Sequence, residues 1–390
     1  MQSLEEVTVT ADQIQALKPQ MSTVQLSTRD IKNIPAFLGE VDVIRAIQLL
    51  PGVQSGSEGT TGFYVRGGSP DQNLILLDGV PVYNASHLFG FFSVFNADAI
   101  KNVQLTKGGF PARFGGRLSS VLEIDMKEGN LREFHGAGSV GLISSKLTLE
   151  GPLVKDRTSF IISGRRTYYD LLIQPFLPDY LDAGYYFGDL NLKVNHIFSR
   201  KDRLYLSYYG GLDKFYQRET YDDFGYEERF ESSLKWGNHT GSLRWNHLFS
   251  EKLFSNLTAT YTQYKFNVGF SEEYNGQTDG FEYFSRIRDY GLRYDMEYRP
   301  NSDHSLRFGG NYTYHTFNPG VAQFKGGFTD EGVDSVLNLS KPIYSHDAYA
   351  YVEDDWLINS RWRANFGLHY SAYLVNTTFY NSLQPRASLR

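Results

Sequence analysis

The segment DYGLRYDMEY at residues 289–298 alternates between two kinds of side chain along its whole length. Its large apolar side chains all have even numbers: Tyr290, Leu292, Tyr294, Met296 and Tyr298. Its charged side chains all have odd numbers: Asp289, Arg293, Asp295 and Glu297. Successive side chains of a β-strand point to opposite faces, so this pattern predicts a strand with one apolar and one charged face.

The same alternation recurs near residues 189–198, 240–249, 306–315 and 361–370. We expect strands of roughly 11 to 17 residues, longer than the usual ~5–6. Long strands that are apolar outside, polar inside and aromatic at their ends are typical of a transmembrane β-barrel. A soluble sandwich would also alternate, but with shorter strands and fewer aromatic residues.

The predicted connections alternate in length, as they do in outer-membrane barrels. The short polar turns are expected at residues 154–157, 199–202, 250–252, 300–304 and 359–361. The long loops are expected at residues 171–184, 217–232, 271–280, 318–344 and 375–384. Counting from residue 134, with a tight turn near Ile143 and Ser144, gives about eleven strands and a twelfth that begins within residues 384–390.

Composition excludes several classes of function. The chain has 390 residues, no cysteine, and a net charge of −6 from 38 Lys+Arg and 44 Asp+Glu. The absence of cysteine removes disulfides, thiolate metal sites and a cysteine nucleophile. Nucleic-acid binding is disfavoured because no basic cluster is present, and no apolar run approaches the ~20 residues of a membrane-spanning helix. The nine histidines are scattered, and no catalytic arrangement is recognisable, so we expect no metal, no cofactor and no enzyme.

Residues 20–130 have a different, mixed α+β character. Residues 41–50 (VDVIRAIQLL) predict a short helix with Val41, Ile44, Ile47 and Leu50 on one face. Residues 63–68, 74–82, 99–105 and 121–126 predict strands punctuated by glycine turns, among them an Asp-Gly turn at Asp78 and Gly79. Before them, residues 4–11 (LEEVTVTA) are prone to β-structure; they read either as an ordinary first strand or as a strand offered to the sheet edge of another protein.

Several motifs in this order resemble TonB-dependent outer-membrane receptors, in a form similar to those of Bacteroidetes. The matching stretches are DVIRAIQLLPGV at 42–53, YVRGG at 64–68, LILLDGVPVYN at 74–84 and IKNVQLTKGGFPARFGGRLSSVLEI at 100–124. The resemblance implies a TonB box and flexible segment at 1–19, a plug domain at 20–130 and the N-terminal part of a transmembrane β-barrel at 131–390. A family barrel is implied to have 22 strands, so we expect the chain to hold the plug and about half of the barrel.

The resemblance also implies roles for particular residues. The expected TonB box is Glu5, Glu6, Val7, Thr8, Val9, Thr10 and Ala11. The expected latch between plug and barrel wall is Arg66, Arg113 and Arg117. The expected solute contacts are Ser57, Glu58, His87, Phe89, Phe91, Tyr180, Tyr221, Phe224 and Tyr274.

The function that the resemblance implies is active uptake of a large or scarce solute across the cell outer membrane of a Gram-negative bacterium. The solute would be a siderophore, vitamin, glycan or peptide, and the plug would be gated by a pull on the TonB box. The implied partners are a TonB-type energy transducer of the inner membrane, outer-membrane lipid and an extracellular solute. An outer-membrane signal transducer and a barrel enzyme remain alternatives; a passive porin would lack the plug and the box.

Overall fold

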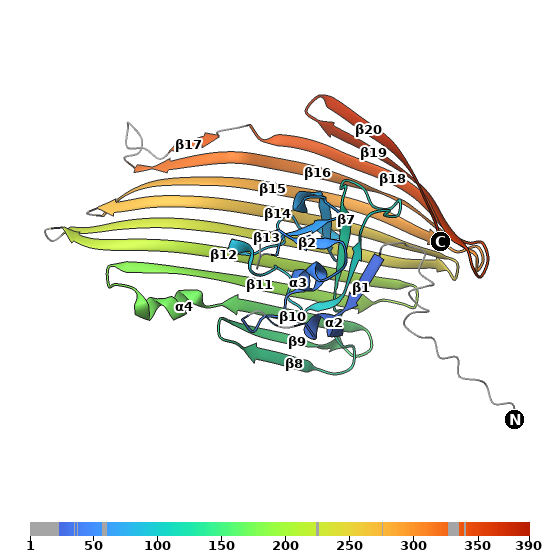
Figure 1. The fold of residues 1–390 in the computed structure, drawn as a ribbon, viewed down its shortest axis with the longest axis horizontal. Coiled ribbons are helices and arrows are strands. Elements are labelled where there is room, and N and C mark those ends of the chain that lie inside the picture. Colours follow the sequence, from blue (N-terminus) through green and yellow to red (C-terminus); the bar gives the residue numbers. More distant parts are fainter. Residues whose placement is uncertain are drawn as a thin grey trace.

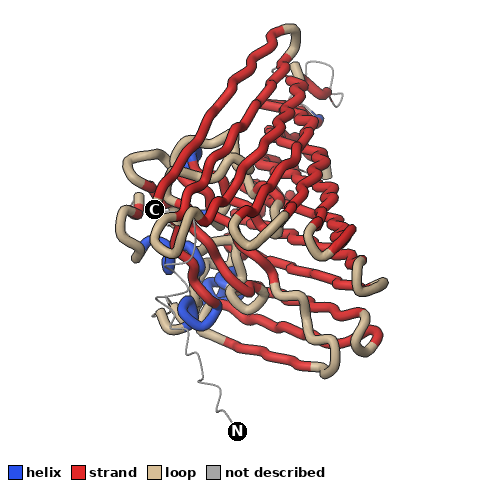
Figure 2. The backbone as a smooth tube through the Cα atoms, turned by 90° about the vertical axis from the view of Figure 1, so that its right-hand side faces the viewer, coloured by secondary structure: helices blue, strands red, loops and turns tan. Residues whose placement is uncertain are grey.

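The structure is a computed structural model that describes residues 23–34, 36, 38–56, 61–223, 226–274, 276–326, 335–338 and 341–390. It contains a small N-terminal unit and a large curved sheet of long strands (Figure 1). The N-terminal unit lies against one face of the large sheet, and Figure 2 shows both from the side. No helix among the described residues is long and apolar enough to cross a membrane, a criterion that does not apply to strands.

A five-stranded sheet in the order β1-β6-β7-β4-β5 is the framework of the N-terminal unit. Its strands are β1 (Thr23–Ser27), β4 (Asn73–Leu77), β5 (Val80–Pro81), β6 (Ile100–Thr106) and β7 (Ser120–Met126). A hairpin of β2 (Val53–Ser55) and β3 (Phe63–Val65), two helices, α2 (Thr28–Lys32) and α3 (Val43–Gln48), and two 3-10 turns, η1 (Pro70–Gln72) and η2 (Leu88–Gly90), pack around it. Strands β4 and β7 are parallel, whereas the other pairs in this sheet are antiparallel.

Helix α3 confirms the helix predicted from the spacing of its apolar residues. Asp42 caps its N-terminus by accepting hydrogen bonds from the backbone N–H groups of Ile44 and Arg45 at 2.8 and 3.1 Å. Ile44 and Ile47 are fully buried in the core of the unit. Burial of each such side chain stabilises the fold by roughly 1.5–3 kcal/mol. This burial compensates for the low intrinsic stability of so short a helix.

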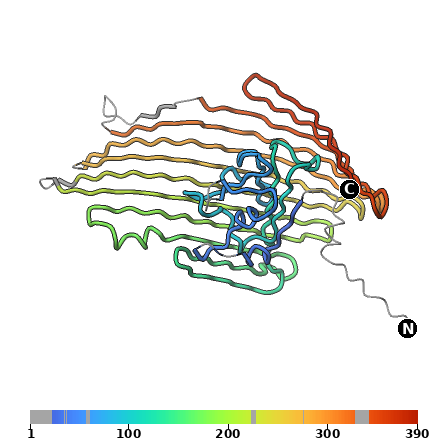
Figure 3. The backbone as a smooth tube through the Cα atoms, viewed as in Figure 1, coloured from blue at the N-terminus to red at the C-terminus, as the bar shows by residue number. Residues whose placement is uncertain are grey.

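The large sheet is antiparallel throughout and follows the order of the sequence. Its twelve successive strands are β8 (His135–Val140), β9 (Ser144–Val154), β10 (Thr158–Thr167), β11 (Leu181–Ile197), β12 (Asp202–Asp223), β13 (Tyr226–Ser250), β14 (Leu253–Tyr274), β15 (Gln277–Tyr298), β16 (His304–Lys325), β18 (Ile343–Leu357), β19 (Arg363–Val375) and β20 (Thr378–Leu389). The short strand β17 (Ser335–Asn338) pairs with β16, and helix α4 (Tyr169–Ile173) and turn η3 (Gln174–Phe176) lie between β10 and β11. Strands β8 and β20 form the two edges of the sheet in the described part of the chain (Figure 3).

All five predicted short turns are confirmed, as is the hairpin of β8 and β9. The predicted strand lengths are wrong at the centre of the sheet, because strands β12 to β16 have 22 to 25 residues. Two predicted long loops, 217–232 and 271–280, are mostly strand. The predicted loop at 375–384 is also wrong, since β19 ends at Val375 and β20 begins at Thr378, earlier than expected.

Candidate functional site: the interface between the two units

The turn between β4 and β5 projects from the N-terminal unit into the large sheet. Asp78 in this turn is 3% exposed and has a left-handed backbone, with φ +48°. Its carboxylate accepts hydrogen bonds from Lys193 Nζ of β11 at 2.9 Å and from Ser207 Oγ of β12 at 2.6 Å. The backbone N–H of Met126 also donates to it, at 3.0 Å. Asp78 therefore ties β7 of its own unit to two strands of the large sheet.

Gly79 completes this turn and allows two arginines to approach it. Arg244 Nη2 of β13 donates to the carbonyl oxygen of Asp78 at 2.7 Å. A Cβ atom on Gly79 would lie 2.7 Å from Nη2 of Arg293, and its φ of +81° is left-handed. Glycine alone satisfies both constraints. The Asp-Gly pair predicted as a turn is thus also the point at which three strands of the large sheet, β11, β12 and β13, bond to the N-terminal unit.

His87 forms a second contact, at the start of turn η2. Its side chain is 1% exposed and lies between two carboxylates, with Nδ1 2.9 Å from Asp213 Oδ2 and Nε2 3.1 Å from Asp189 Oδ2. Its ring stacks on Phe187 with a centroid separation of 3.6 Å. Burial acts to lower the pKa of His87, but the two carboxylates outweigh burial and raise this pKa. The two carboxylates thus favour the charged form of the ring, whereas burial opposes it.

Further charged and polar groups enclose the histidine. Arg165 Nη2 of β10 donates to Asp189 at 2.5 Å, and the hydroxyls of Tyr185 and Tyr209 donate to Asp213 and Asp189. Glu40 of the N-terminal unit lies 3.9 Å from Arg165 Nη1 and 3.3 Å from Lys146 Nζ. Acids and bases from both units thus alternate through the cluster, which compensates the cost of burying them.

A third contact joins the glycine-rich loop after β6 to the last strand of the sheet. Arg386 Nη1 of β20 donates to the backbone carbonyl oxygens of Phe110, Pro111 and Phe114 at 3.2, 2.7 and 2.6 Å. His369 of β19 contacts the carbonyl oxygen of Ala112 through Nδ1 at 2.7 Å. These contacts involve backbone acceptors of the loop, so they depend on its conformation more than on its side chains.

The three arginines predicted as a latch have different surroundings. Arg113 Nη1 lies 2.9 Å from Glu353 Oε1 of β18, and this carboxylate is also 3.8 Å from Arg307 Nη1. Arg66 and Arg117 are exposed, and Arg117 Nη1 donates to the carbonyl oxygen of Gly116 at 2.8 Å. Arg113 thus pairs with a carboxylate of the large sheet, and the latch role of all three stays a prediction.

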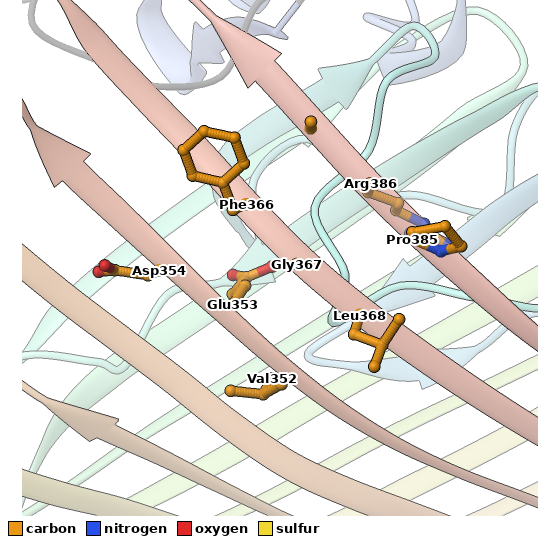
Figure 4. Close-up of a pocket in the computed structure, with 9 residues that line it drawn as sticks. Val352, Glu353, Asp354, Phe366, Gly367, Leu368, Pro385 and Arg386 are labelled. Atoms are coloured by element: carbon orange, nitrogen blue, oxygen red, sulfur yellow. The ribbon is translucent and has the colours of Figure 1, made fainter.

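A shallow cleft of about 500 Å³ runs along β18 to β20 beside this contact (Figure 4). It is lined by Val352, Glu353, Asp354, Phe366, Gly367, Leu368, Pro385, Arg386 and Ala387. Two of these residues, Glu353 and Arg386, hold the loop of the N-terminal unit. At Gly367 a Cβ atom would lie 2.6 Å from Cβ of Ala112. The cleft therefore adjoins the docking site of that loop.

The predicted solute contacts are dispersed. Phe89 and Phe91 are 56% and 44% exposed at turn η2, and Tyr180 stacks on Tyr221 with a centroid separation of 5.7 Å. Tyr274 is exposed at the end of β14. His87, in contrast, is buried between carboxylates as described above. Several predicted residues lie outside the described residues: Ser57, Glu58, Phe224 and the TonB box at 5–11.

Beyond the N-terminal unit, the long strands carry apolar side chains on the face that holds this unit. Asn238 of β13 donates to the unit, and the alternation along β13 and β14 places Trp236 and Phe266 on that same face. These two rings stack at 6.3 Å. Phe281 and Phe324 form a similar pair on β15 and β16, at 5.3 Å. We call these four side chains the aromatic vestibule.

Sequence reasoning missed most of the residues that join the two units. Asp78, Glu40, Lys193, Arg165, Asp213 and Arg386 belong to this missed set. The only sequence signal for the wall residues among them is a charged side chain on the polar face of a predicted strand. Such a side chain can equally contact another unit or be solvated, so the signal does not identify the contacts. Within the described residues, no group of three or more His, Asp or Glu side chains is arranged to hold a metal ion.

Comparison with known families identifies the N-terminal unit. Residues 18–120 match the sequence model of the TonB-dependent Receptor Plug Domain. The chain carries a TonB-dependent receptor plug domain. The N-terminal unit is hereafter the plug, and the large sheet is the barrel wall.

Solved structures support the same fold for both parts. The copper transporter OprC matches with a TM-score of 0.64 and 12% identity over 95% of this chain and 60% of its own. The outer membrane transporter YddB from Escherichia coli gives 0.64 and 11%, over 94% and 58%. P. aeruginosa FpvA, solved bound to heterologous pyoverdines, gives 0.60 and 13%, over 96% and 54%. The chain thus spans about 60% of the length of these structures and shares their fold over that part, a plug domain on one face of a truncated β-barrel.

Proposed function

We propose that the full-length protein takes up a scarce solute across the outer membrane, powered by a TonB-type transducer of the inner membrane. The observation that carries this proposal is a plug domain held on one face of a barrel wall by clusters of polar contacts. Polar contacts can be exchanged for water when the plug moves, which apolar packing of the same area would resist. The outer membrane would then be the location of the protein.

The proposed route of force begins at residues 5–11, which would pair as a strand with the transducer. Such pairing uses backbone hydrogen bonds, so it requires β-propensity and exposure more than particular side chains. Force applied there would reach the plug through β1, the first described strand, which pairs with β6 over five residues. Arg66, Arg113 and Arg117 would act as the latch that this force releases.

The proposed solute site is the space beyond the plug, bounded by the aromatic vestibule and by Phe89 and Phe91 of the plug. Aromatic faces suit solutes with apolar or ring surfaces, because stacking and burial reinforce each other. This chemistry is compatible with a siderophore, vitamin, glycan or peptide. The exposed pair Tyr180 and Tyr221 would contribute from the rim of the wall.

The test deletes residues 5–11 from the full-length protein in its native host. The cells are limited in turn for iron, cobalamin, an oligosaccharide or a peptide nitrogen source. We expect the deletion to reproduce the growth defect of the complete gene deletion on one of these sources, while the protein level in the outer membrane stays constant. A control in which residues 12–17 are scrambled should grow as the wild type. Growth that depends on the gene but survives the deletion would refute the proposal.

A further inference from the structure

Five cationic side chains gather on neighbouring strands of the barrel wall. They are Lys214 of β12, Lys235 of β13, Lys265 of β14, and Arg286 and Arg288 of β15. Lys214 lies directly opposite Lys235, and Lys265 lies directly opposite Arg286. We call these five residues the cationic belt.

The cationic belt faces away from the plug. Asp213 accepts a hydrogen bond from the plug, and Lys214 follows it, so Lys214 points to the opposite face of β12. Thr262 donates to the carbonyl oxygen of Pro81 in the plug, and Lys265 is three residues further along β14, again on the opposite face. The pairing of β12 to β15 is continuous through this region, so the other belt residues share the outward face.

An aromatic girdle provides a reference level from which the position of the cationic belt along the barrel axis can be measured. Tyr208 and His239 form a hydrogen-bonded pair at 2.8 Å, and Tyr261 packs on Tyr290 at 5.4 Å, all on the outward face. On β13, the outward residues between His239 and Phe249 include only apolar, aromatic or glycine side chains and one further histidine. Ten residues of a strand tilted by ~40° cover about 26 Å of height, close to the apolar band of a membrane barrel.

Lys235 lies four residues beyond the girdle on the same strand. Four residues correspond to about 10 Å of height at the same tilt. The headgroup region extends about 5–8 Å outside the hydrocarbon core, and the flexible stem of a lysine can span the remaining few ångströms. The belt therefore lies at the level of the headgroups at the end of the wall nearer the plug's Asn84 and His87, which contact β12 and β13.

The charges of the belt are not compensated within the described part of the chain. No described carboxylate forms an ion pair with any of the five residues. Lys265 instead lies 4.8 Å above the ring of Phe284, and Arg286 lies 5.7 Å from the same ring. Like charges directly opposite each other destabilise a pair of strands. Two such pairs, one between β12 and β13 and one between β14 and β15, point to anions that bind at these pairs.

We propose that the cationic belt binds the phosphate groups of phosphorylated lipid in the leaflet that surrounds this end of the barrel. A phosphate between Lys265 and Arg286 would convert a repulsive pair into two charge-assisted hydrogen bonds. The acyl chains of the same lipid would lie on the apolar surface below, beside Tyr261 and Tyr290. A soluble phosphate would gain the first interaction but not the second. The inference rests on the proposed outer-membrane location and is independent of any transported solute.

The test uses the purified full-length protein in nanodiscs and the triple variant Lys235→Gln/Lys265→Gln/Arg286→Gln. Native mass spectrometry measures the binding of bisphosphorylated lipid A, of the same lipid after removal of both phosphates, and of inorganic phosphate alone. The matched control is Arg200→Gln/Lys201→Gln/Arg203→Gln, which removes three exposed cations near the turn at the other end of the wall.

We expect the triple variant to bind bisphosphorylated lipid A at least tenfold more weakly than the wild type, and the control to stay within twofold. The wild type should bind the dephosphorylated lipid at least tenfold more weakly than it binds the bisphosphorylated lipid. This wild-type comparison decides the question even if the triple variant fails to fold. Equal binding of both lipids, or equal occupancy by inorganic phosphate alone, would overturn the proposal. Since no transducer or solute takes part, failure here is separable from failure of the uptake proposal.

Discussion

Replacement of Asp78 by asparagine tests whether the turn between β4 and β5 holds the plug in the barrel. Asparagine tolerates the left-handed backbone at this position and keeps an acceptor for the N–H of Met126. It removes the charge that faces Lys193, whose ammonium group lies 2.9 Å away and whose side chain is 6% exposed. The substitution therefore leaves a buried cation without its counter-ion while it disturbs the turn little.

Breaking a buried ion pair by removing one partner costs about 3–5 kcal/mol. The lower value applies here because Lys193 also donates to the carbonyl oxygen of Met126 at 3.2 Å. At ~1.4 kcal/mol for each factor of ten, a cost of about 3 kcal/mol raises the undocked population of the plug about 100-fold.

The chain has no cysteine, so one reporter thiol can measure this population. Ser93 is fully buried, its carbonyl oxygen accepts from Arg165 of the wall, and Ser93→Cys is nearly isosteric. In this background, we expect Asp78→Asn to raise the rate of maleimide labelling about 100-fold. The control Asp71→Asn, an exposed aspartate on the same unit, should leave the rate within twofold.

The double variant Asp78→Asn/Lys193→Met separates two explanations of faster labelling. It removes the uncompensated cation, so it should recover most of the lost protection if the ion pair is the cause. Labelling of Asp78→Asn that equals the Asp71→Asn control would refute the argument. A double variant that labels as fast as the single one would assign the effect to the turn instead.

Three further predictions use limited proteolysis, the same thiol reporter and the thermal unfolding of the full-length protein. Arg386→Met removes the guanidinium donor from the carbonyl oxygens of Phe110, Pro111 and Phe114, of which Pro111 keeps the N–H of Phe114, and should make proteolysis of this loop at least tenfold faster, with β20 itself intact. The pKa of His87 is raised in the folded protein, so the charged ring stabilises docking fully below its ordinary pKa near 6.5, and this contribution is lost as the pH rises through the higher folded pKa. The protein with His87 should therefore be labelled more slowly than the His87→Gln variant at low pH. At high pH the two labelling rates should become equal. Gly367→Val should lower the free energy of plug docking by roughly 1–3 kcal/mol, seen as a lower melting temperature, because Ala112 occupies the space that its side chain needs.

The plug was predictable from local sequence because its elements are short and its signals are local. Val41, Ile44, Ile47 and Leu50 recur at helical spacing, and all four pack into one core. The strands ended at glycines, as expected, since a left-handed backbone at Gly67 or Gly79 terminates an extended segment. Each of these inferences needs information from fewer than ten neighbouring residues.

The contacts between plug and wall could not be predicted in this way. Arg113 was recognised as a candidate for pairing, but its partner Glu353 is 240 residues away in the chain. Identifying that partner requires the register of every intervening strand, because a slip of one residue moves a side chain to the other face. Asp78 was recognised as a turn residue, and nothing local indicated that Lys193 and Ser207 converge on it.

The errors in strand length have a physical cause that also explains the cationic belt. Within the apolar band, outward residues of β13 such as Leu243 and Trp245 are apolar, whereas beyond the girdle the outward residues are polar, as at Lys235. The inward face changes in the opposite sense, to Trp236 and Phe266. Such a change of pattern resembles the end of a strand, and the loops predicted at 217–232 and 271–280 are wrong for this reason.

Strand length and membrane thickness are therefore separate properties of this wall. Backbone pairing continues to Tyr274 on β14, because inter-strand hydrogen bonds form equally well beside lipid or water. The apolar band ends earlier, at Tyr261, where the outward side chains cease to be apolar. In the proposed outer-membrane location, the segment between them would have water or headgroups outside and a protected space inside, and each face has the polarity that such an environment favours. The inverted alternation beyond the aromatic girdle would then mark the part of each strand that leaves the membrane, and it places the cations and the aromatic vestibule at the same height on opposite faces.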